Sequence, residues 1–160
     1  MVKIALQFKC NLENVTDLQA EGEDFRWYLK VKCLNCGEEN PSWIYVTLED
    51  SQPVKGGRGN ANFVTHCKLC GRQNSLDILK DSICLYKIQD NNRFKTLVSF
   101  DCRGLEPIDF SPRVGFAAKG VESETKFQDI NLTEKEWADY DESAQEAVGI
   151  YEVTHQFIKL

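Results

Sequence analysis

Four cysteines in two similar short segments are the residues of this chain best suited to chemistry. They are Cys33 and Cys36 in Cys-Leu-Asn-Cys-Gly, and Cys67 and Cys70 in Cys-Lys-Leu-Cys-Gly. In each pair a turn presents both sulfurs to one point, and four soft thiolates suit a tetrahedral zinc site. One Cys-x-x-Cys pair is also typical of thiol–disulfide enzymes, whereas two pairs with the same trailing glycine favour a metal. The sequence therefore predicts one Zn²⁺ held by these four residues.

The ligand types indicate what kind of zinc site this is. A catalytic zinc keeps a position open for water and is usually held by three protein ligands, often His, Asp or Glu. Four thiolates close the shell, which favours a structural ion. Storage, transfer or redox release of the zinc is the alternative. The glycines Gly37 and Gly71 allow a positive φ after each pair, so that backbone N–H groups can approach the sulfurs.

Composition places the chain among soluble globular proteins. It has 160 residues, 42% of them hydrophobic, and no apolar run of membrane-spanning length. The first residues lack the apolar stretch of a signal peptide. We therefore expect a cytoplasmic protein, with the nucleus as the second choice, and no membrane partner. Seven cysteines, an odd number, suit a compartment in which thiols stay reduced.

The balance of charge argues against nucleic acid as a partner. The chain has 19 Lys and Arg against 25 Asp and Glu, a formal charge of −6. An acidic protein without a basic run is poorly suited to phosphate backbones.

Apolar residues alternate with polar ones along most of the chain, which is typical of half-buried strands. The clearest strand, Phe25–Cys33, leads directly into the first cysteine pair. The other strands expected are Ile4–Cys10, Trp43–Leu48, Asn62–His66, Ser75–Leu79, Ile83–Ile88, Phe94–Cys102 and Ile150–Ile158. A capping box at Thr133 and Glu136 predicts one short helix, running to about Gln145. The fold class is therefore all-β and sandwich-like, with at most short helices.

A weak internal repeat indicates how the chain is organised. Phe8-Lys-Cys10 recurs as Phe100-Asp-Cys102. We interpret residues 1–80 as a zinc-binding β unit and residues 93–160 as a related β unit without metal ligands. Residues 81–92 join the two units, which could form one compact domain.

Two further features bear on function. The loop Lys55-Gly-Gly-Arg-Gly-Asn60 lacks the ending of a phosphate-binding Walker loop, but its glycines and cations could form an anion-binding recognition element. No arrangement of catalytic residues is visible, so we predict a protein that is not an enzyme. The alternative is a thiol-dependent reductase that uses Cys84 or Cys102.

Several segments outside the cysteine pairs resemble a known family. They include Glu23-Asp-Phe-Arg-Trp-Tyr-Leu29, Cys102-Arg-Gly-Leu-Glu-Pro107 and Val148-Gly-Ile-Tyr-Glu-Val-Thr-His-Gln-Phe157. With both cysteine pairs and the glycine-rich loop, they are similar to the eukaryotic CXXC-motif-containing zinc-binding proteins. The resemblance spans nearly the whole chain. It implies an all-β fold of two related halves, one zinc on Cys33, Cys36, Cys67 and Cys70, and no catalytic activity. The function we expect is a module that binds another protein.

Overall fold

The computed structural model describes residues 2–56 and 59–160, and these are mainly β. Strands make up 57% of the described residues and short helical turns 4%, which confirms the predicted fold class. The strands are β1 (Val2–Glu13), β2 (Val15–Ala20), β3 (Trp27–Cys33), β4 (Ile44–Val46), β5 (Gln52–Pro53), β6 (Asn60–Ala61), β7 (Phe63–His66), β8 (Gln73–Leu79), β9 (Lys95–Arg103), β10 (Leu105–Ser111), β11 (Phe116–Gly120), β12 (Lys126–Ile130), β13 (Trp137–Asp141) and β14 (Glu146–Lys159). Two 3-10 turns, η1 (Lys80–Ser82) and η2 (Ile88–Asp90), separate β8 from β9.

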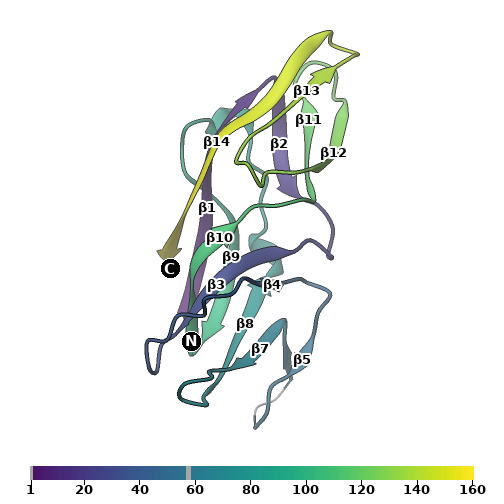
Figure 1. Ribbon diagram of the computed structural model, residues 1–160. Helices are drawn as coiled ribbons and strands as arrows, with labels where there is room; N and C mark the ends of the chain where they lie inside the picture. Colours follow the sequence, from purple (N-terminus) through teal and green to yellow (C-terminus); the bar gives the residue numbers. More distant parts are fainter. Residues whose placement is uncertain (1, 57–58) are drawn as a thin grey trace.

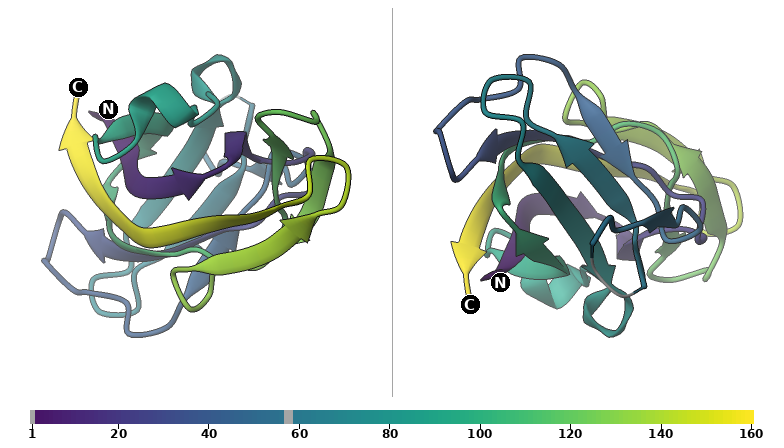
Figure 2. Two further views of the ribbon diagram at one scale, coloured as in Figure 1. Left: turned by 90° about the horizontal axis from the view of Figure 1, so that it is seen from above. Right: turned by 90° about the horizontal axis from the view of Figure 1, so that it is seen from below.

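The largest sheet has the strand order β13-β14-β1-β9-β8-β7, with antiparallel pairing throughout. The N-terminal strand β1 lies near its centre, between β9 and the long C-terminal strand β14 (Figure 1). Strands from early and late parts of the chain therefore share one sheet. Viewed along the long axis, β14 curves around the other strands (Figure 2).

Two three-stranded sheets complete the fold. Their orders are β10-β3-β4 and β12-β11-β2, and the short strands β5 and β6 pair with each other. In Figure 1 the β2, β11 and β12 group lies at one end of an elongated molecule, and β7 and β8 lie at the other. The β10-β3-β4 sheet lies between these ends and carries the first cysteine pair at the end of β3.

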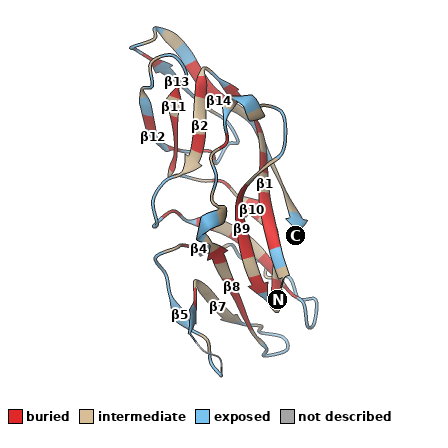
Figure 3. Ribbon diagram, turned by 180° about the vertical axis from the view of Figure 1, so that it is seen from behind, coloured by how far each residue is buried: buried red, intermediate tan, exposed pale blue. Residues whose placement is uncertain are grey.

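The core is formed by the inward faces of these sheets. Along β3 the residues alternate between buried and half-buried, with Trp27 and Leu29 inside. The Trp27 ring packs edge-on against Phe100 of β9, with ring centroids 6.3 Å apart, and lies 6.0 Å from Phe110 of β10. Figure 3 shows the buried residues as stripes along β1, β9 and β8. Large aromatic side chains dominate the area removed from water, so this cluster fixes the position of β3.

The predicted helix at Thr133–Gln145 is wrong. The Asn131 side chain accepts hydrogen bonds from the backbone N–H of Thr133, at 2.9 Å, and from its hydroxyl. A tight turn follows, and Trp137–Asp141 then pairs with β14 as strand β13. Pairing with a long neighbouring strand outweighs a capping signal that spans only one turn.

The predicted strand at Ile83–Ile88 is also wrong. This segment begins after η1 and ends at the first residue of η2, and a single bridge from Tyr86 to Leu18 joins it to a strand. The buried Tyr86 hydroxyl donates to the carbonyl of Arg93 at 2.7 Å, which holds the segment in an irregular path.

The other seven predicted strands correspond to β1, β3, β4, β7, β8, β9 and β14, with ends that differ by up to four residues. Sequence reasoning missed β2, β10, β11, β12 and β13 and the two-residue strands β5 and β6. In the described residues, no helix is long and apolar enough to cross a membrane. The division into related units at 1–80 and 93–160 stays a prediction.

Candidate metal centre

Two turns of the same geometry present the four cysteines. The first knuckle (residues 33–37) follows β3 directly, and the second knuckle (residues 67–71) follows β7. In each turn the glycine N–H donates at 2.8 Å to the carbonyl of the first cysteine. Gly37 and Gly71 have φ values of 80° and 75°, as the sequence predicted, and side chains rarely adopt this left-handed region. The local sequence therefore shapes both turns in the same way.

The structure brings the four predicted ligands to one place. The sulfurs of Cys33, Cys36, Cys67 and Cys70, here called the cysteine cluster, all lie within 4.8 Å of one another. The Cys33 and Cys70 sulfurs are 3.8 Å apart, and those of Cys36 and Cys67 are 3.5 Å apart. A tetrahedron with Zn–S bonds of about 2.3 Å has edges of about 3.8 Å. The cluster therefore fits a zinc ion, and bound zinc would link the two knuckles.

The cluster lies at the surface. Cys33 is buried at the end of β3 and Cys67 is half-buried, whereas Cys36 and Cys70 are exposed. One side of the cluster is therefore continuous with the core, and the opposite side faces solvent.

Two asparagines connect each knuckle to the sulfurs of the other. Asn35, inside the first knuckle, hydrogen-bonds to Cys70, and Arg72 donates to the Asn35 Oδ1 at 3.3 Å. Asn74, just after the second knuckle, lies against Cys33. The buried Asn74 amide has a second orientation, in which its Nδ2 donates not to Cys33 but to the carbonyls of Gln73 and Gly104, each at 3.1 Å. These amides hold the knuckles in register.

Neighbouring groups lower the pKa of the Cys33 and Cys70 thiols and raise that of the Cys36 thiol. A hydrogen bond from Asn74, followed by one from the Cys36 backbone N–H, lowers the pKa of Cys33 to about 6. The pKa of Cys70 is also lowered, first by the Asn35 amide and then by the Arg72 backbone N–H. At Cys36 the Glu38 N–H favours the thiolate, but desolvation and the neighbouring sulfurs outweigh it and raise the pKa to about 12. The cluster thus favours negative charge at Cys33 and at Cys70, which suits a cation between the two knuckles.

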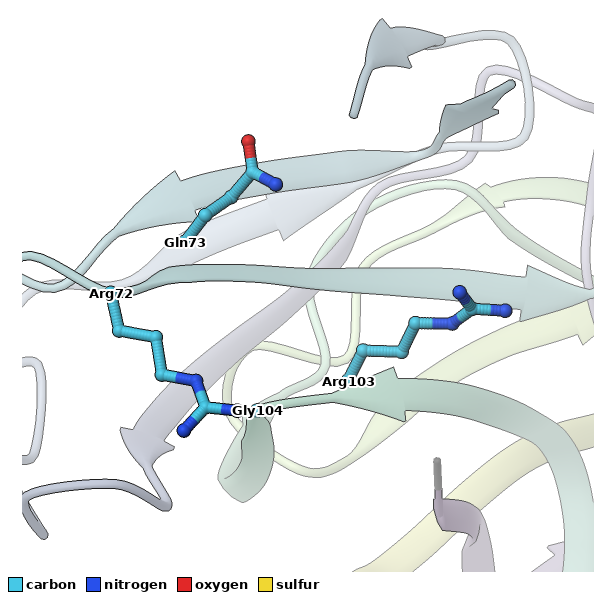
Figure 4. A pocket seen from close by; sticks show the side chains of 4 residues that line it. All are labelled: Arg72, Gln73, Arg103 and Gly104. Carbon is cyan, nitrogen blue, oxygen red and sulfur yellow. The ribbon is translucent and has the colours of Figure 1, made fainter. Parts of the chain in front are cut away.

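A turn at Gly104, in a third segment of the chain, contacts the first knuckle. Gly104 lies between β9 and β10, and its carbonyl accepts from the Leu34 N–H of the first knuckle at 2.9 Å. An open cavity of about 340 Å³ lies beside this turn, lined by Arg72, Gln73, Arg103 and Gly104. Figure 4 shows the two guanidinium groups pointing in different directions, so they do not converge on one ligand.

The glycine-rich loop is attached to the metal centre through Gln73. The Gln73 side chain accepts from the Lys55 N–H and donates to the Lys55 carbonyl, both at 3.1 Å. The loop is therefore held beside the second knuckle. The predicted convergence of Lys55 and Arg58 on an anion stays a prediction, because residues 57 and 58 lie outside the described residues.

The three remaining cysteines lie apart from the cluster. Cys10 and Cys102 are buried in the core, and desolvation raises the pKa of each thiol to about 12. Cys84 is exposed in the irregular segment before η2.

The fold and site define a class: a mainly β protein in which two Cys-x-x-Cys knuckles form a four-thiol metal site. The family of eukaryotic CXXC motif containing zinc binding proteins matches residues 5–158, and the chain belongs to it. The human CXXC motif containing zinc binding protein is 64% identical over 159 residues, covering 99% of each chain. The cysteine cluster and the family agree on zinc as the metal.

Solved structures show the same fold. The structure titled "Crystal Structure of C1orf123" has a TM-score of 0.96 and 63% identity, and the match covers 99% of each chain. A hypothetical protein from Plasmodium falciparum has a TM-score of 0.90 at 26% identity, covering 99% of this chain and all of that one.

Sequence reasoning missed the residues that support the cluster. Asn35, Asn74 and Gly104 come from three segments, and their contacts depend on how the sheets meet. One signal was present: Asn74 directly precedes the strand predicted at Ser75–Leu79, and asparagine is disfavoured in strands.

Proposed function

We propose that Cys33, Cys36, Cys67 and Cys70 bind one structural zinc ion, and that the chain is a cytoplasmic, non-catalytic module for binding another protein. The observation that carries the structural role is the convergence of four thiols from two knuckles. Four thiolates leave no position for substrate or water at the metal. The zinc would therefore act by fixing β3 and β7, to which the knuckles are attached.

Two exposed leucines support binding at the knuckles. Leu34 and Leu69 lie between the two cysteines of their knuckles, with exposed fractions of 44% and 69%. Solvent-exposed leucines gain from burial, about 25 cal/mol for each Å² of apolar area removed from water. A metal-fixed turn presents such a side chain in one conformation, which reduces the entropy lost on binding. The knuckle tips are therefore suited to contact a partner protein.

The experiment compares the captured partners of zinc-loaded protein and of a Leu34→Ser/Leu69→Ser double variant. A Val121→Ser variant is the control, since Val121 is 41% exposed and follows β11, in the group at the opposite end of the molecule (Figure 1). Partners lost with the double variant and kept with the control support the proposal. If the double variant keeps every partner and retains its zinc, the knuckles are not the binding surface.

The exposure of Cys36 and Cys70 favours a second candidate function, the transfer of zinc. An incoming thiol could reach these two sulfurs without unfolding the protein. A chelating dye of high zinc affinity distinguishes the candidates: transfer requires release much faster than global unfolding, whereas a structural ion leaves at the unfolding rate.

The reductase alternative has weaker support. Burial keeps the Cys102 thiol protonated, so this residue is a poor nucleophile. Cys84 is accessible, but no second thiol of the described residues lies beside it in the segment between η1 and η2.

A further inference from the structure

The outward face of the β3–β4 pair combines aromatic rings with cations. Alternate residues of β3 point away from the core, and Tyr28 of β3 lies directly opposite Tyr45 of β4. Trp43 precedes β4. The exposed fractions of Trp43 and Tyr45 are 36% and 42%. With three nearby cations they form what we call the aromatic–cation face: Arg26, Tyr28, Lys30, Trp43, Tyr45 and Arg113.

Each cation of this face lies over a ring. The Arg113 Cζ is 3.9 Å from the centre of the Tyr28 ring, and the Arg26 Cζ is 4.5 Å from that of Tyr45. The Lys30 Nζ lies 4.9 Å from the nearest Trp43 ring centre. The rings of Tyr28 and Tyr45 are themselves 5.7 Å apart. Stacking of this kind restricts long side chains and presents their charged ends in fixed positions.

The charge of these cations is not neutralised by an ion pair. Within residues 2–56 and 59–160, none of the three lies within salt-bridge distance of a carboxylate, whereas Lys80, Lys95, Lys119 and Lys159 each do. Arg26 instead donates to the Tyr28 hydroxyl at 3.4 Å, and Arg113 donates to the Ser111 hydroxyl at 3.3 Å. In a chain with a net charge of −6, these three cations therefore lie over neighbouring rings without a carboxylate in salt-bridge contact.

Several carboxylates lie near the face, and Glu21, Asp24 and Asp129 line a hollow together with Arg26 and Tyr28. Asp109 of β10 lies opposite Lys30 in the strand register, but its Oδ1 is 3.3 Å from the His155 Nε2. Asp50 interacts weakly with Arg26. Among the described residues, none of these carboxylates forms a salt bridge with the stacked cations, so the three cations remain available to a negatively charged partner.

We propose that the aromatic–cation face binds an extended acidic segment of a partner protein. Carboxylates would contact the three stacked cations, and the side chains between them would pack on the rings of Trp43 and Tyr45. Because β4 is the edge strand of its sheet, an extended segment can lie alongside it. The inference rests on the proposed interaction function only in taking the partner to be a protein.

A short acidic peptide fits this face better than nucleic acid does. Three cations can form ion pairs with only a few carboxylates, the number that a short acidic peptide carries. The remainder of the acidic protein would repel a phosphate backbone that extends beyond the face.

The test is selection of a random phage-displayed peptide library on zinc-loaded protein. We expect enriched peptides to carry Asp or Glu, and to bind an Arg26→Gln/Lys30→Gln/Arg113→Gln variant at least about tenfold more weakly, the effect of losing one charge-assisted contact. The matched control is Lys3→Gln/Lys126→Gln/Lys135→Gln, which changes net charge equally at exposed lysines elsewhere and should bind as the wild type does.

Several results would overturn the inference. These are no enriched peptide, enriched peptides without acidic residues, or equal binding by the two triple variants. Tighter binding of an oligo(dT) strand than of any selected peptide, lost with the first variant, would assign the face to nucleic acid instead. None of these results depends on the Leu34→Ser/Leu69→Ser variant. Interaction through Leu34 and Leu69 is therefore tested independently of this inference.

Discussion

The Asn74 amide occupies the space that a side chain on Gly104 would need. A Cβ added to Gly104 would lie 2.2 Å from the end of that amide, and Gly104 has a φ of 79°. The same glycine accepts a hydrogen bond from the first knuckle through its carbonyl. The turn that connects β9 to β10 therefore contacts both knuckle regions and helps to support the metal centre.

Replacing Gly104 by alanine should destabilise the protein by more than about 2 kcal/mol, because both the left-handed backbone and the close contact disfavour a Cβ. The control is Gly56→Ala, since Gly56 has a φ of 74° and no atom of another segment of the described residues lies within 4 Å of the added Cβ. That variant should lose only about 1 kcal/mol, the backbone contribution alone. Urea unfolding in excess zinc measures the free energy of unfolding of both variants. Equal losses would mean that the Asn74 contact does not matter.

Replacing Cys33 or Cys67 by serine should abolish stoichiometric zinc and lower the free energy of unfolding by several kcal/mol, because the binding energy of a structural zinc contributes to folding. Elemental analysis and thermal melting measure the two effects. Cys84→Ser, which changes an exposed thiol outside the cluster, should keep both the metal and the melting temperature. A Cys67→Ser protein that melts like the wild type would refute a structural role.

The spacing of the cysteines was sufficient to predict the cluster, because each knuckle is set by five consecutive residues. The strands with strict alternation, above all β3, were predictable for the same local reason. Asn35, Asn74 and Gly104 were not, since their contacts join segments about 30 to 70 residues apart and depend on sheet packing. The helix prediction at Thr133–Gln145 was wrong because the capping signal is local and weak. Pairing of Trp137–Asp141 with β14 decides the structure there, and it depends on the fold as a whole.

Alkylation of the native, zinc-loaded protein with iodoacetamide at about pH 8 should modify Cys84 and leave Cys10 and Cys102 unmodified. Burial both blocks access to the two core thiols and raises their pKa to about 12, so few thiolates form. Mass spectrometry of peptides locates the label, and denatured protein is the control in which all three should react. Rapid labelling of Cys102 in the native state would contradict this prediction and support Cys102 as the reactive residue of a reductase.

Asp141 should make stability depend on pH in the acid range. Its buried carboxylate accepts from the Ser123 hydroxyl, from that of Thr125 at 3.0 Å and from the backbone N–H groups of Ser143 and Ala144. These bonds, that of Ser123 first, lower the pKa of Asp141. Because the folded pKa lies below the unfolded value of about 3.9, this stability is present above that value and is lost as pH falls through the folded pKa.

The Asp141→Asn variant should therefore be less stable than the wild type at about pH 7, and the difference should shrink at about pH 3. Chemical unfolding at both pH values measures it. Asp139→Asn, at an exposed residue of the same strand, should show no such convergence. A difference that stayed constant with pH would mean that the Asp141 charge makes no contribution.

The position of β1 between β9 and β14 has a consequence for synthesis on the ribosome. β1 leaves the exit tunnel well before its two partners, which begin at Lys95 and Glu146, so neither neighbour exists while the residues between β1 and β9 are being made. The Leu160 N–H, just after β14, donates to the Lys3 carbonyl at 2.9 Å. The central sheet can close only after β9 and β14 have been synthesised, and until then the apolar face of β1 is a surface for chaperones to cover.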